Sequence, residues 1–278
     1  MACMADAFQL ARLHDRALVA VEGPDWRSLL QGLLTQDVET LVAGELRYGA
    51  LLTPQGRLLF DLVILGTETG ALLDVEAARR DAFIQRLSMY RLRAKATVER
   101  ADGGVFVLWG AASPLMPAPW IADPRLPGLG FRAYALDAPA QPNAEAAAYD
   151  AHRLLMGAPD PARDCAGETT YPIEANLDLL NGIDFKKGCF VGQETTSRMK
   201  RRGQIKSRML PLTLQGAEPA PGAEVLAAGD LRAGEVRSAG AGRVMALMRL
   251  DRALGADLTI DGRPARLAPP EWLTISES

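Results

Sequence analysis

The first part of the chain contains two different patterns of apolar residues, one with helical spacing and one of continuous runs typical of buried strands. In residues 26–34 they are spaced three and four apart, which predicts one stripe of an amphipathic helix, and Gly23-Pro24-Asp25 supplies its start. Residues 46–52 and 57–65 are apolar runs separated by Thr53-Pro54-Gln55-Gly56. Proline followed by glycine at this spacing is turn chemistry, so the two runs predict a hairpin.

Shorter runs continue this alternation of strands and helices. They predict strands at 18–21, 71–75, 95–100 and 105–109 and a helix at 77–89. A further helix is expected to begin at Asn143, a favourable N-cap residue, and to end at Gly157. Strands and helices mixed with hairpins favour an α+β fold over a doubly wound sheet.

The pattern changes from Arg208 onward, where short apolar runs are punctuated by glycine. This punctuation is typical of a small antiparallel barrel. A chain of 278 residues exceeds the usual size of a single core. We therefore expect three domains, at 1–100, 101–205 and 206–278, of which the first two are α+β modules and the last is the barrel.

Composition narrows the class of protein. No run reaches the ~18 apolar residues of a membrane span, and the first residues lack the pattern of a secretory leader. The three cysteines, Cys3, Cys165 and Cys189, lie far apart, which argues against a disulfide framework and favours a reducing, cytoplasmic location. With two histidines in all, no permanently bound metal is expected.

One stretch combines residue types that a core element does not need. Residues 186–194 place Cys189 between two lysines and two glycines, followed by an amide and a carboxylate. A short helix starting near Cys189, together with the adjacent lysines, would favour its thiolate. The alternative is a structural cysteine buried in a glycine-bounded turn.

The same region is strongly basic. Residues 186–208 hold eight Lys and Arg against the single acid Glu194, a local charge of +7 in a chain whose net charge is −3. Such a patch indicates an anion-binding face, for RNA, another polyanion or the anionic tail of a small molecule, with a solvated surface as the plain alternative. Few aromatic residues are interleaved with these charges, so direct nucleic-acid binding is not expected.

Lys187 to Glu194 reads KGCFVGQE, which resembles the signature of the YgfZ-type folate-binding proteins. These are relatives of the glycine-cleavage aminomethyltransferase and are implicated in iron–sulfur protein maturation. The resemblance extends to residues 171–177, 30–37 and 52–57 and spans most of the chain. It implies two α+β modules around a central folate channel, a C-terminal antiparallel β-barrel, and tetrahydrofolate or a derivative as the ligand.

The resemblance also implies particular site residues. Cys189 is then the reactive thiol. The rest of its motif consists of Lys187, Gly188, Gly192, Gln193 and Glu194. The implied folate contacts are Asp61, Arg125, Arg132, Glu174, Asn176, Lys186 and Arg198.

A true aminomethyltransferase is the alternative within the same superfamily. The transferases resembled here carry two adjacent aspartates where this chain has Phe60-Asp61. Phenylalanine cannot exchange a proton, so the group acting in acid–base chemistry is missing. Asp61, if buried, must be paired or catalytic.

These arguments lead to one functional hypothesis. The chain is expected to bind folate and to support assembly or repair of iron–sulfur proteins through Cys189, with those client or assembly proteins as partners and no membrane. Any cluster must be transient or shared, because clusters usually need four thiolates.

Overall fold

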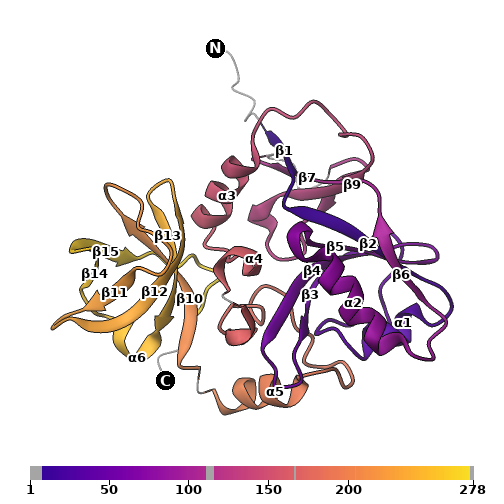
Figure 1. Ribbon diagram of the computed structural model, residues 1–278. Coiled ribbons are helices and arrows are strands. Elements are labelled where there is room, and N and C mark those ends of the chain that lie inside the picture. Colours follow the sequence, from indigo (N-terminus) through magenta and orange to yellow (C-terminus); the bar gives the residue numbers. More distant parts are fainter. Residues whose placement is uncertain (1–7, 111–115, 166, 204, 276–278) are drawn as a thin grey trace. The chain divides into compact units, whose positions relative to one another are not determined.

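The computed structural model describes residues 8–110, 116–165, 167–203 and 205–275, which leaves Cys3 outside the described residues. The chain forms two compact units (Figure 1). Unit 1 consists of Met1–Leu52, Phe60–Tyr149 and Leu180–Val191, and unit 2 consists of Thr53–Leu59, Asp150–Leu179 and Gly192–Ser278. Each unit is described by itself below.

A five-stranded antiparallel sheet forms the centre of unit 1. Its order is β3 (Leu46–Leu52), β4 (Leu58–Gly66), β5 (Gly70–Glu76), β2 (Arg16–Glu22) and β6 (Thr97–Ala101). Helix α2 (Arg80–Arg91), preceded by the 3₁₀ turn η1 (Ala77–Arg79), packs against β2 and β6. Its buried Phe83 meets Phe60 edge to face, with ring centroids 5.2 Å apart. Phe60 therefore belongs to the core beneath α2.

A second sheet of unit 1 has four strands in the order β1 (Gln9–Leu13), β7 (Gly104–Trp109), β9 (Phe131–Ala135) and β8 (Ile121–Ala122). The 3₁₀ turn η2 (Pro127–Leu129) leads into β9. One face of this sheet, with Leu13 and Val107, packs on Leu18 of the first sheet and on Tyr149 of α3 (Ala146–Leu155). The other face carries a separate small apolar cluster.

Unit 2 contains the closed barrel, coloured orange to yellow in Figure 1. Its strands in order are β10 (Ser207–Leu214), β13 (Arg243–Arg249), β12 (Leu231–Gly240), β11 (Glu224–Ala227), β14 (Leu258–Ile260) and β15 (Arg263–Leu267). Alternate side chains of these strands, such as Leu210 and Leu212, fill its core. The barrel expected from the glycine punctuation is confirmed.

The remaining helices of the described chain are short. They are α1 (Trp26–Gln31) in unit 1 and α4 (Pro161–Asp164), η3 (Gly167–Thr169), α5 (Gln193–Arg202) and α6 (Leu250–Ala253) in unit 2. The mixture of helices and strands with a C-terminal barrel confirms the expected α+β class. The division into three domains stays a prediction.

Two details of the expected elements are wrong. The apolar stripe of residues 26–34 predicted a longer helix, but α1 ends at Gln31, and Leu34 instead forms an isolated bridge with Leu51 of β3. Asn143 does not cap α3, which begins three residues later. Its amide accepts from the N–H of Leu10 (2.8 Å) and donates to the carbonyl of Phe8 (3.1 Å), so it pairs with the outer edge of β1.

Candidate functional site

The loop that carries Cys189 is docked on the residues that follow α1. Lys187 Nζ donates to the carbonyl oxygens of Gln31 (2.8 Å), Leu34 (2.6 Å) and Gln36 (2.8 Å). The last carbonyls of a helix have no partner within it, and the early end of α1 leaves these oxygens available. Lys187 therefore joins the two sequence motifs at 30–37 and 187–194.

Further hydrogen bonds strengthen this docking. Thr35 Oγ1 donates to the carbonyl of Gly182 (2.6 Å), and the N–H of Asp184 donates to the carbonyl of Thr35 (3.0 Å). Gln36 Nε2 donates to the carbonyl of Asn181 (2.6 Å). Because each of these contacts uses a backbone group of residues 181–184, they fix the course of the loop.

Within the loop, Cys189 is exposed between two anchored positions. Before it, Asp184 Oδ1 accepts from the N–H of Lys186 (2.7 Å) and of Lys187 (3.2 Å). After it, Phe190 is buried, with its ring 5.4 Å from Lys187 Nζ. This arrangement presents the thiol to solvent on a fixed support, so the alternative of a buried structural cysteine is wrong.

The ammonium group of Lys187 is engaged by three carbonyls, and its effect on a Cys189 thiolate stays a prediction. Burial lowers the pKa of Lys187 to about 8, although the carboxylates of Asp37, Asp184 and Glu39 oppose that shift. Lys186, in contrast, is exposed.

The expected helix also starts later than predicted. Helix α5 begins at Gln193, four residues after Cys189, and its N-cap Gly192 has a left-handed φ of 80°. A left-handed conformation of this kind favours glycine. Glu194 lies in the first turn, where a negative charge is favourable, and Arg198 is exposed on the helix.

Asp37 holds together the segment on which the loop docks, and it was not among the site residues expected from the sequence. Its carboxylate accepts from Gln31 Nε2 (2.7 Å), Thr40 Oγ1 (2.5 Å) and Arg47 Nη1 (3.1 Å). Burial by itself would raise the pKa of Asp37, but the hydrogen bonds from Thr40 and Gln31 outweigh it and hold the pKa at about 2. Its place in the motif of residues 30–37 was the available signal.

Three of the residues expected to contact folate, Asp61, Arg125 and Arg132, take part in a buried ion-pair network in unit 1. Asp61 pairs with Arg16 (3.4 Å), which also donates to Asp74 (2.6 Å). Arg132 joins Asp74 (2.7 Å) to Asp123 (2.8 Å). Asp61 is thus paired, and the network links the two sheets.

Arg125 closes this network at its other end. Its guanidinium donates twice to the carboxylate of Asp123, at 3.0 and 2.8 Å. Burial alone would raise the pKa of Asp123, but Arg125 and Arg132 hold it well below its usual range. The guanidinium groups of both arginines are therefore engaged by carboxylates, and their contact with folate stays a prediction.

The last two expected contacts lie in unit 2. Asn176 is buried, with its amide between the carbonyl of Met209 (2.7 Å) and Arg208 Nη1 (3.1 Å). Glu174 is half-buried and accepts from the N–H of Tyr171 (2.8 Å). Burial raises the pKa of Glu174, which that hydrogen bond and the positive charges of Arg57 and Arg237 only partly offset.

Two negative findings apply to the part of the chain that the structure describes. No group of three or more His, Cys, Asp or Glu side chains there is arranged to hold a metal ion. No helix there has both the length and the apolar character needed to cross a membrane.

Comparison with solved structures defines the class of fold. The chain superposes on the glycine cleavage system aminomethyltransferase T of Bartonella henselae with a TM-score of 0.76 and 19% identity, covering 95% of this chain and 85% of that one. Residues 206–275 match the family model of the CAF17 C-terminal beta-barrel domain. The protein therefore has an aminomethyltransferase-like fold with a barrel of this type.

Curated relatives then define the family. The chain is 32% identical to the human iron-sulfur cluster assembly factor IBA57, covering 98% of this chain and 87% of the relative. It is 33% identical to the mouse protein of the same name, over 82% and 75% of the two chains. It is 29% identical to a Neurospora crassa homolog, of which it spans 66%. The chain belongs to the IBA57 family, and the resemblance stated from the sequence is confirmed.

The expected cytoplasmic location is wrong by this comparison, because these relatives are named mitochondrial proteins. The expectation rested on the small number of cysteines. Cysteine content reflects the redox state of a compartment, and it does not distinguish one reducing compartment from another.

Proposed function

We propose that the protein acts in the assembly or repair of iron–sulfur proteins and uses Cys189 as its reactive group. Membership of the IBA57 family supports the process. The observation that carries the role of the residue is an exposed thiol on a loop fixed by Lys187 and Phe190. A thiolate is a ligand for iron, and on this loop it does not have to be uncovered before a partner arrives.

If Cys189 is the one thiolate that the protein supplies, it cannot hold a cluster without a partner. Clusters are usually held by four ligands, so the cluster is the cargo, and a client or assembly protein supplies the other ligands. Cys189 then contributes one thiolate, releasing its proton to solvent. The polyanion-binding alternative is not favoured, because the relatives are named for cluster assembly.

We further propose a reduced folate such as tetrahydrofolate as a ligand, supported by the aminomethyltransferase-like fold. The pterin ring offers amide and amino N–H donors, which a carboxylate accepts as a pair. Glu174 is suited to this in unit 2. Nearby Thr170 Oγ1 and Arg237 Nε are buried and lack hydrogen-bond partners among the described residues. These donor and acceptor groups fit a polar heterocycle.

The proposal does not include aminomethyl transfer. The side chain of Phe60 packs against Phe83 and beneath Arg79, whose guanidinium carbon lies 4.2 Å from the ring centroid. An aromatic ring in this core supplies no acid or base for a reaction on folate.

The first test replaces Cys189 by alanine. Because the side chain is exposed and supports no core, the variant is expected to fold with an unchanged melting temperature. It should fail to restore iron–sulfur enzyme activity in cells that lack the native factor. Cys165→Ala, at a half-buried cysteine, is the matched control and should restore activity. Full complementation by Cys189→Ala would remove this residue from the mechanism.

The second test is ligand binding. Tetrahydrofolate that binds only the folded chain should stabilise it by about 2.7 kcal/mol at a hundredfold excess over the dissociation constant. The measurement is the thermal shift with and without ligand, confirmed by calorimetry. Glu174→Gln should weaken binding, while Glu224→Gln, at an exposed barrel position, should not. Absence of heat and of thermal shift at saturating ligand would rule out the folate part of the proposal.

A further inference from the structure

The outer face of the four-stranded sheet carries an arginine laid over an aromatic ring. Arg12 of β1 lies directly opposite Phe106 of β7 in the strand register. Its guanidinium carbon is 5.8 Å from the centroid of the Phe106 ring. This distance is within the range of a cation–π contact, which uses none of the N–H donors of the guanidinium and leaves them available for a ligand.

Gly104, the first residue of β7, provides the space for this contact. A Cβ atom there would lie 3.0 Å from Arg12 Nε and 3.0 Å from Cε2 of Phe106. Its φ is not in the left-handed region, so the backbone conformation does not demand glycine. The absence of a side chain at Gly104 instead leaves the space in which Arg12 lies over Phe106.

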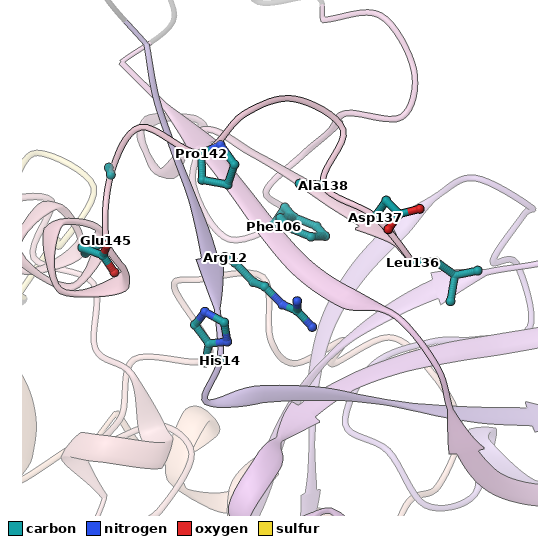
Figure 2. A pocket seen from close by; sticks show the side chains of 9 residues that line it. Arg12, His14, Phe106, Leu136, Asp137, Ala138, Pro142 and Glu145 are labelled. Carbon is teal, nitrogen blue, oxygen red and sulfur yellow. The ribbon is translucent and has the colours of Figure 1, made fainter.

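A pocket of about 290 Å³ opens at this end of the sheet (Figure 2). Arg12 and His14 enter it from β1 and its end, and Asp137 and Glu145 lie on either side of them in the view. None of these four side chains forms an ion pair with any residue that the structure describes. Charged groups of both signs therefore line one small pocket without neutralising one another.

The rest of the lining is apolar. Leu136 is 74% exposed, and Pro142, Ala138 and Ala144 complete the wall. At roughly 30 Å³ per water-sized group, the volume admits a molecule of about the size of valine and is too small for a nucleotide.

We propose that this pocket binds a small apolar α-amino acid as its zwitterion. The carboxylate pairs with the N–H edge of Arg12, and the ammonium pairs with Glu145 or Asp137. The aliphatic side chain covers Leu136. This site is independent of Cys189 and of the proposed folate ligand.

The charges disfavour two simpler ligands. An inorganic anion would meet the carboxylates of Asp137 and Glu145, which repel it. A metal cation would meet the permanent positive charge of Arg12. A ligand that carries both charges a short distance apart satisfies the two sides of the pocket together.

The test compares three molecules that share an isopropyl group by NMR titration of the full chain. L-valine carries both charged groups, 3-methylbutanoate lacks the ammonium, and 2-methylpropan-1-amine lacks the carboxylate. Valine is expected to bind at least tenfold more tightly than either, with shifts at residues 12–14 and 136–145. Equal binding of 3-methylbutanoate would show an anion site, and no binding of valine would show no site; either result overturns the proposal.

Substitutions test separately the groups proposed to bind the carboxylate and the ammonium of the amino acid. Arg12→Gln and Glu145→Gln should each weaken valine binding at least tenfold, and Gly104→Ala should weaken it with all charges retained. Arg93→Gln, at an exposed position after α2, is the matched control and should bind as the wild type does. Both charge variants are at exposed positions, so their melting temperatures should be unchanged. Undiminished binding by Arg12→Gln would place valine elsewhere and contradict the assignment.

Discussion

Replacing Asp74 by alanine is expected to lower the free energy of unfolding by about 3–5 kcal/mol. Asp74 is fully buried and accepts from Arg16 (2.6 Å), Arg132 (2.7 Å) and the hydroxyl of Tyr134 (3.2 Å). Removing the carboxylate leaves two buried guanidinium groups with less than their full complement of acceptors. The cost arises from those uncompensated charges and exceeds the value of any single hydrogen bond. The measurement is urea denaturation of both proteins.

The chain offers a matched control for this substitution. Asp81 on α2 also pairs with an arginine, Arg100, but their side chains are 66% and 60% exposed. Exposed pairs are screened by water, so Asp81→Ala should cost less than about 1 kcal/mol. Equal losses from the two substitutions would show that burial does not determine the strength of the network.

Replacing Lys187 by methionine is expected to destabilise the protein by about 2–4 kcal/mol and to release the Cys189 loop. Methionine retains most of the apolar stem but donates no hydrogen bond, so the carbonyls of Gln31, Leu34 and Gln36 lose their shared donor. Each partly buried acceptor left unpaired costs of order 1 kcal/mol or more. Hydrogen exchange should accelerate in residues 181–191. Lys186→Met, at the exposed neighbour, should change stability by less than about 0.5 kcal/mol.

The same lysine predicts a dependence on pH. The pKa of Lys187 is lowered to about 8 in the folded chain, against 10.5 for an ordinary lysine. Between these values the unfolded chain binds more protons, so the contribution of this group to stability rises as the pH increases from about 8 to 10.5. The difference in stability between wild type and Lys187→Met should therefore grow across this window. A difference that shrinks would contradict the burial of the amine.

Elements that are determined by neighbouring residues could be predicted from short stretches of sequence. Pro54 and Gly56 predicted the hairpin of β3 and β4, and the turn closes through the N–H of Gly56 and the carbonyl of Thr53 (2.8 Å). Glycine spacing after Arg208 predicted the barrel. In each case the turn residues that determine the structure lie next to the strands they connect, so a short stretch of sequence is enough to predict it.

Partners distant in the chain were not predictable in the same way. The sequence showed that Asp61 must be paired if buried, but its partner Arg16 lies 45 residues away. The sequence also placed Lys187 beside Cys189 without showing that its ammonium points toward Gln31, 156 residues earlier. Composition identifies which groups are charged, whereas tertiary packing determines which way each side chain points. The start of α5 was misplaced for a related reason, since Gly188 and Gly192 are both plausible helix starts.

The docking of the Cys189 loop also links the placement of this thiol to the order in which the chain folds. Lys187 and its acceptors are separated by 151 to 156 residues, and contacts at such separation form late, after local elements are in place. During synthesis the loop has no support until residues 31–36 and 181–191 have both emerged and the N-terminal sheets have formed. A chain damaged in its first fifty residues would lose the placement of a thiol that lies far downstream. The placement of Cys189 therefore depends on the intact fold of unit 1.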